Sequence, residues 1–171
     1  NFCMDGLVYP DRTVHTGLLE YKNVYRPVRV VSYDKESGEL VLHNYMDFDD
    51  LKDYVKISYE LTQDGLVISK GKLPEVSAAP HSEGKINLKI NVPESGKCYL
   101  KFIYHLKKEL PLLDEDHILG FDEIEVSQKD AKCQLAEKWV EKTVTDSELQ
   151  VSEDDTQIHI KGREFAYTID K

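Results

Sequence analysis

Carboxylates are the residues of this sequence best suited to acid–base chemistry, and they recur as adjacent pairs. The pairs are Asp49-Asp50, Asp122-Glu123 and Asp154-Asp155. Catalysis by two carboxylates requires side chains that face one another across a substrate. Adjacent residues of a strand point to opposite faces, and adjacent loop residues are solvated. We therefore predict that none of these pairs forms a catalytic site.

Histidines and cysteines could supply nucleophiles or metal ligands, but here they are scattered along the chain. They are His15, His43, His81, His105, His117, His159, Cys3, Cys98 and Cys133. None lies at zinc-ligand spacing from another, and the three cysteines form no disulfide framework, so we expect reduced, buried thiols. Phosphate-binding and nucleophile-elbow motifs are also missing. The residues by themselves predict neither an active site nor a transition-metal centre.

The composition is that of a globular protein with a sizeable core. The chain has 171 residues, of which 40% are hydrophobic and 32% charged, which allows one domain plus extra pieces. A net charge of -10 argues against nucleic acid or an anionic membrane as a partner. No apolar run approaches the ~20 residues of a membrane span, and we find no signal peptide. The abrupt opening on Asn1 reads as a piece of a longer polypeptide.

The elements that must position any functional residue are strands, organised around a hairpin over 54–73. Residues 55–62 alternate apolar and polar side chains, which indicates a half-buried strand. Asp64-Gly65 then favours a tight turn with positive φ at both central residues. Further strands are expected at 25–33, 40–44, 85–92, 97–106 and 118–126, with a bulge near Gly120 in the last. We expect a brief helix over 16–22 with Leu18 and Leu19 inward, and an acidic loop over 47–53.

About seven short strands with turns near every ten residues predict an all-β fold, an immunoglobulin-like antiparallel β-sandwich. The alternation assigns its core to Val55, Ile57, Tyr59, Leu88, Ile90, Leu100, Phe102 and Tyr104. Beyond residue 127 the chain is polar and carries Trp139, and two further strands are expected over 148–160 and 164–169. Two strands rarely form a stable unit alone, so we expect them to begin another β domain.

The N-terminal block carries a family resemblance. Its residues are Phe2 to Val8, Asp11-Arg12-Thr13, His15, Glu20 and Lys22. It resembles the multidomain β-galactosidases of glycoside hydrolase family two, and the likeness continues through Asp64-Gly65, residues 117–121 and Arg163-Glu164-Phe165. The resemblance implies three parts. Residues 1–23 would be the C-terminal end of a (β/α)8 catalytic barrel and a linker, 24–127 the sandwich, and 128–171 a linker and the first strands of a C-terminal β-sandwich domain.

The same resemblance implies a site at the N-terminus. In the family, the backbone carbonyl at the position of Phe2 and an Asn side chain at that of Asp5 hold a sodium ion beside the galactose. The ring at Phe2 lines the sugar pocket. Asp5 departs from the family pattern, yet a carboxylate is also a hard oxygen ligand. The family's two catalytic glutamates have no counterpart in this sequence, so we expect a chain that is inactive alone. Sodium, with magnesium as a second candidate ion, would serve the parent enzyme.

Two functions from different classes remain. In the first, the chain is a non-catalytic part of a retaining β-galactosidase for terminal β-D-galactosides such as lactose. It would contact other domains of the same polypeptide, in a parent expected to be a homo-oligomer in the bacterial cytoplasm, with a periplasmic or secreted location as the alternative. In the second, it is a free-standing immunoglobulin-like binding or adhesion module. The inward positions of Tyr59, Phe102 and Tyr104 disfavour an aromatic sugar-binding platform.

Overall fold

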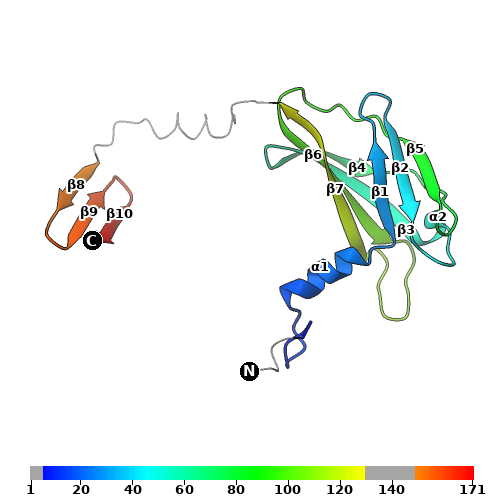
Figure 1. Ribbon diagram of the computed structural model, residues 1–171, viewed down its shortest axis with the longest axis horizontal. Coiled ribbons are helices and arrows are strands. Elements are labelled where there is room, and N and C mark those ends of the chain that lie inside the picture. Colours follow the sequence, from blue (N-terminus) through cyan, green and yellow to red (C-terminus); the bar gives the residue numbers. More distant parts are fainter. Residues whose placement is uncertain (1–5, 130–148) are drawn as a thin grey trace. The chain divides into compact units, whose positions relative to one another are not determined.

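The computed structural model describes residues 6–129 and 149–171, and the chain divides into two compact units, Asn1–Ala131 and Lys132–Lys171. The domain boundaries expected at 23/24 and 127/128 stay predictions. Both units are built from antiparallel strands (Figure 1). No described helix is long and apolar enough to cross a membrane.

Two antiparallel sheets form the first unit, which confirms the predicted all-β sandwich. Its helices are α1 (Thr16–Val24) and α2 (Leu51–Tyr54), and its strands are β1 (Val28–Tyr33), β2 (Glu39–Asn44), β3 (Val55–Gln63), β4 (Leu66–Lys72), β5 (Glu83–Asn87), β6 (Gly96–Leu106) and β7 (Ile118–Lys129). One sheet has the order β1-β2-β5 and the other β4-β3-β6-β7. Figure 1 shows them as two layers, with α1 leading into β1.

The predicted β3–β4 hairpin is confirmed, including its turn. Asp64 has φ 49° and Gly65 has φ 84°, the left-handed conformation required at both central residues of a type I′ turn. The Asp64 side chain also accepts a hydrogen bond from the Lys97 N–H at 2.9 Å, at the start of β6. The turn therefore ties two neighbouring strands of the four-stranded sheet together.

The core lies between the sheets, where the inward side chains predicted from alternation are buried. Of the eight predicted core residues, six are buried and two, Tyr59 and Ile90, are partly buried against the same cluster. The buried cluster comprises Val28, Leu40, Leu42, Leu51, Val55, Ile57, Leu61, Val76, Ala78, Leu88, Cys98, Leu100, Phe102 and Tyr104. Cys98 is a free thiol in this core, as expected; Cys3 and Cys133 lie outside the described residues.

The strand expected over 85–92 is wrong in its extent. Strand β5 spans Glu83–Asn87, and Asn87 pairs with Glu39, the first residue of β2. Before Glu39 the chain that forms β2 turns away from β5 at Gly38. The Gly38 carbonyl accepts a last hydrogen bond from the Leu88 N–H at 2.7 Å. Leu88, Ile90 and Val92 still pack against the core cluster, although residues 88–92 form no strand. The predicted inward side chains are therefore confirmed, whereas the predicted strand is too long at this end.

The two helices also correct the expectations. The last three residues of the expected acidic loop, 51–53, form α2 together with Tyr54, and the Asp50 side chain caps this helix by accepting the Lys52 N–H at 3.1 Å. Helix α1 runs two residues beyond the predicted end, and its Leu19 is 61% exposed instead of inward. Strand β1 consequently begins at Val28, after Pro27.

The predicted bulge in β7 is present. Tyr104 of β6 pairs with Gly120 and His105 pairs with Ile118, which leaves Leu119 as the extra residue. A bulge of this kind reverses which side chains face the core. Leu119 and Ile124, whose positions differ in parity, therefore both pack against the core cluster.

The second unit is a three-stranded antiparallel sheet with the order β10-β9-β8, not the two strands expected. The strands are β8 (Gln150–Glu153), β9 (Gln157–Lys161) and β10 (Ala166–Asp170). The expected strand over 148–160 is broken because the Asp154 carboxylate accepts the N–H groups of Thr156 and Gln157, both at 2.8 Å, and closes a turn. No described residue of this unit is buried.

Candidate functional site

Phe2 and Asp5, the residues expected to bind sodium and sugar, lie outside the described residues. In the parts of the chain that the structure covers, 6–129 and 149–171, no group of three or more His, Cys, Asp or Glu side chains could hold a metal ion. The site that the described residues do build is instead a polar junction between α1 and the sandwich.

The adjacent acid pairs point in opposite directions or into solvent, as predicted. On β7, Asp122 is partly buried whereas Glu123 is exposed. Asp49 is exposed, and its neighbour Asp50 is used to cap α2. Asp154 closes the β8–β9 turn. In the pairs on β7 and before α2, the two carboxylates therefore differ in exposure and in what they bind.

The junction, which we call the Asp122 junction, consists of Asn23, Arg26, Val30, Tyr104 and Asp122. One Asp122 oxygen accepts a bond from the Arg26 guanidinium at 2.5 Å. The other accepts the Tyr104 hydroxyl at 2.5 Å and the Val30 N–H at 3.0 Å. Arg26 also donates to the Asn23 carbonyl at 2.7 Å, at the end of α1. Four separate segments of the chain therefore meet at one carboxylate.

A second link joins α1 to β7 directly. The Asn23 side-chain oxygen accepts the Phe121 N–H at 2.8 Å. Gly120 lets the two segments approach this closely, since a Cβ there would lie 2.7 Å from the Arg26 Cβ and 2.9 Å from the Asn23 side-chain oxygen. Gly120 thus belongs both to the bulge and to the junction.

Burial sets the electrostatics of this junction. Tyr104 is fully buried, and its desolvation, followed by the negative charge of Asp122, raises the pKa of its phenol well above the ordinary value. The Tyr104 hydroxyl therefore stays protonated and acts as a donor. The Arg26 and Asp122 side chains are each 14% exposed, so water screens this ion pair less than a surface pair.

This arrangement is suited to anchoring, not to acid–base chemistry. The Asp122 oxygens accept three bonds from groups that keep their protons, so most of the acceptor capacity of this carboxylate is used within the fold. The sequence did not predict that these residues meet. The one available signal was a charged residue at an inward position of an apolar strand, because buried carboxylates are rarely unpaired. Nothing in the sequence identified Arg26 as the partner.

Two weaker contacts flank the junction. Arg29 donates to the Val24 carbonyl at 2.7 Å and lies over the Tyr45 ring, 5.2 Å from its centroid. Lys22 lies 3.0 Å from the His117 ring nitrogen, which joins α1 to the loop before β7. The end of α1 is therefore held from both sides, although none of its residues is buried.

Comparison with known proteins identifies the family. The sequence model of a family described as β-galactosidase, domain 4, matches residues 40–127, just over half of the chain. The chain belongs to this family. The match begins within β2 and continues into β7, two residues short of the end of that strand. The Tyr104 and Asp122 arms of the junction therefore lie inside β-galactosidase domain 4, and its α1 arm precedes the matched region.

Whole-chain relatives extend this result beyond domain 4. The chain is 41% identical over 173 residues to a β-galactosidase of Actinobacillus pleuropneumoniae and 30% identical over 176 residues to one of Staphylococcus xylosus. Both alignments cover the entire chain but only 16% of the relative. The chain thus spans about one sixth of the length of the curated relatives it matches.

Proposed function

We propose that this chain is a non-catalytic, structural part of a retaining β-galactosidase that hydrolyses terminal β-D-galactosides such as lactose. Its sandwich braces the catalytic barrel, and the Asp122 junction fixes the angle at which α1 enters the sandwich. The alignment that carries this proposal is the 41% identity to the Actinobacillus pleuropneumoniae β-galactosidase along the whole chain. That alignment includes α1 and the second unit as well as domain 4.

The surface of α1 supports packing against another part of a larger protein. Leu19, Tyr21 and Val24 of α1 and Tyr25, directly after it, are 61%, 48%, 49% and 69% exposed. Exposed large apolar side chains that gather on one element mark interaction sites. The junction holds this helix firmly while leaving its apolar side chains free for a partner, which we propose is the barrel of the same polypeptide.

For the parent enzyme we propose a sodium ion beside the galactose, held partly by the Phe2 carbonyl and the Asp5 carboxylate, with the Phe2 ring against the sugar. Both donors are hard oxygens, the type that alkali and alkaline-earth cations prefer. Magnesium is the second ion we propose for the parent, which would be a homo-oligomer in the bacterial cytoplasm. These assignments rest on the family resemblance of the N-terminal block.

Turnover of a chromogenic β-galactoside tests the main proposal. The full-length gene product should hydrolyse it with retention of the anomeric configuration, and the 171-residue chain should not, because the two carboxylates of the chemistry lie elsewhere. Activity of the purified chain that disappears when one of its own acids is replaced would overturn the structural role. A full-length product that binds sugars without cleaving them would favour a binding module.

Sodium dependence tests the ion site. In the full-length enzyme, Asp5→Ala should weaken activation of kcat/KM by sodium, since a ligand is lost. Asp5→Asn should behave mildly, because an amide oxygen retains the ligand. Asp11→Ala, a change at an exposed turn residue that binds Thr13, is the control. An unchanged sodium profile in Asp5→Ala would reduce Asp5 to a turn residue.

A further inference from the structure

A cavity of about 180 Å³ opens where strand β4 leaves the edge of β3. The β3–β4 ladder begins at Ser58 and Lys72, and a last bond joins the Leu73 N–H to the Ile57 carbonyl at 2.9 Å. The chain then crosses toward the other sheet, so Val55 and Ile57, which pair with β6 on one side, border the cavity on the other. The apolar wall consists of Leu51, Val55, Ile57, Leu73, Pro74 and Val76.

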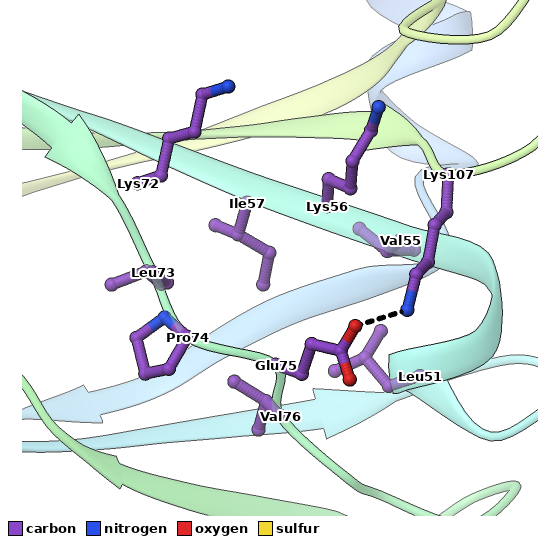
Figure 2. Close-up of a pocket in the computed structure, with 10 residues that line it drawn as sticks. All are labelled: Leu51, Val55, Lys56, Ile57, Lys72, Leu73, Pro74, Glu75, Val76 and Lys107. Atoms are coloured by element: carbon purple, nitrogen blue, oxygen red, sulfur yellow. Dashed lines mark hydrogen bonds and ion pairs between the residues drawn. The ribbon is translucent and has the colours of Figure 1, made fainter.

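The rim of this cavity is positively charged, although the chain carries a net charge of -10. Lys56, Lys72 and Lys107 line it together with one acid, Glu75. In Figure 2 the apolar side chains converge below β3, whereas the ammonium groups of Lys56 and Lys72 project on its outer side. The cavity therefore has an apolar interior and a cationic border.

The three lysines differ in what they already bind. Lys107 donates to Glu75 at 2.6 Å, the contact drawn in Figure 2, and to the Lys52 carbonyl at 2.6 Å. Lys56 contacts Glu115 at 2.8 Å and Asp116 at 2.5 Å. Within residues 6–129 and 149–171, Lys72 forms no salt bridge, although its charge contributes to lowering the pKa of Asp116.

A second groove continues from the first on the outer face of the sheet. It shares Lys56, Ile57 and Lys72 with the cavity and adds Ser58, His105, Asp116 and Ile118. The Ser58 hydroxyl and the His105 ring nitrogen lie 2.8 Å apart. Hydroxyl and imidazole groups can donate to an oxyanion, while Asp116 is already bound to Lys56. The groove beside Lys72 thus adds hydroxyl and imidazole groups to the border of the cavity, together with one carboxylate.

We propose that this cavity binds a small amphipathic carboxylate, with its apolar tail against Ile57 and Val76 and its carboxylate at Lys72. An apolar cavity of about 150 Å³ is large enough for a benzene ring, so an aryl group or a short alkyl tail fits the observed volume. Burial of the tail supplies affinity, and the Lys72 ammonium group, which forms no salt bridge among the described residues, selects an anion over a cation. The site is separate from the enzyme function proposed above and does not depend on it.

Titration of the 171-residue chain with octanoate, below its micelle concentration and followed by ¹⁵N–¹H NMR, tests this site. Saturable shifts should appear at Val55, Ile57 and Val76. Octylammonium has a tail of the same length and the opposite charge, and acetate has the head group alone. Neither compound should produce saturable shifts at these three residues. Equal binding of octylammonium would overturn the proposal, as would shifts spread evenly over the surface.

Lys72→Glu should weaken octanoate binding by about tenfold or more, because it replaces attraction by repulsion at the head group, and Lys72→Gln should lie between the two. Lys70→Glu is the matched control: Lys70 is exposed on the same strand but lines neither groove. The affinity of the Lys70→Glu variant for octanoate should stay within about twofold of the parent, since water and salt screen an exposed charge that lies outside the site. A Lys72→Glu variant that binds normally, or a Lys70→Glu variant weakened equally, would remove the site. Both lysines are exposed, so both variants should fold.

Discussion

On the inner face of the sheet, strands β3 and β6 place apolar side chains opposite one another. The Asp122 junction, by contrast, joins groups of unlike chemistry. Along the ladder, Ile57 is opposite Tyr104 and Leu61 is opposite Leu100. At the junction, a carboxylate, a guanidinium and a phenol come from β7, the segment before β1, and β6. The two regions share Tyr104, whose ring belongs to the core and whose hydroxyl belongs to the junction.

This difference determines how each region depends on the rest of the fold. Apolar burial is non-directional and tolerates small displacements. A buried carboxylate needs every donor in place, because an unpaired charge in the interior is costly. We therefore expect a substitution in the junction to destabilise the fold more than a comparable substitution in the apolar core.

The largest effect is expected at Asp122. Asp122→Ala removes one charge and leaves the Arg26 guanidinium and the Tyr104 hydroxyl buried without their acceptor, which should cost about 3–5 kcal/mol in the free energy of unfolding. Glu123→Ala, one residue along β7 on the exposed face, should change it by less than about 0.5 kcal/mol. Urea unfolding at neutral pH measures both. If the two variants were equally stable, Asp122 would be a surface acid and the junction would not stabilise the fold.

The next effect is expected in the core. Ile57→Ala, within β3, and Leu88→Ala, beyond the end of β5, should each cost about 2–5 kcal/mol, because both side chains are buried in the same cluster. Val67→Ala on β4, where the side chain is 52% exposed, is the control and should cost less than about 0.5 kcal/mol. An unchanged denaturant midpoint in Leu88→Ala would show that burial outside the ladder adds no stability.

The regions also differ in how well the sequence predicted them. Alternation over 55–62 and 97–106 depends on the residues of each strand alone, so the faces and the β3–β4 hairpin followed from local pattern. The junction joins Arg26 to Asp122, 96 positions apart. No local pattern specifies such a pairing, and it depends on the exact register created by the Leu119 bulge.

The errors in secondary structure have local physical causes of a different kind. Strand β5 stops at Asn87 because its partner β2 has no residue left to pair, a property of Glu39 and Gly38 and not of residues 88–92. The break between β8 and β9 and the short helix α2 both result from an aspartate side chain that bonds to nearby N–H groups, Asp154 in one case and Asp50 in the other. Aspartates favour caps and turns for this reason. The β8–β9 turn and helix α2 could therefore have been predicted from the sequence.

The smallest effect is expected at Asp50, which lies far from the junction along the chain but is also a carboxylate with several donors. It accepts the Ser77 hydroxyl at 2.9 Å, the Ala78 N–H at 3.1 Å and the Lys52 N–H at 3.1 Å. Burial raises the pKa of Asp50, but the hydrogen bonds from Ser77, Lys52 and Ala78 outweigh it, and the net pKa lies below the ordinary value of 3.8.

A carboxyl group with a lowered folded-state pKa stabilises the native state above its unfolded-state pKa and loses that contribution as the pH falls through the folded-state value. At pH 7 Asp50→Asn should therefore be less stable than the parent, by no more than about 1 kcal/mol, because asparagine is also a good N-cap. This gap should narrow below pH ~4 as Asp50 becomes protonated in the parent. Asp49→Asn, an exposed neighbour, should show no such change. Urea unfolding at several pH values between 7 and 3 gives each gap, and a gap for Asp50→Asn that stays constant over this range would show that the charge of Asp50 does not contribute to the cap.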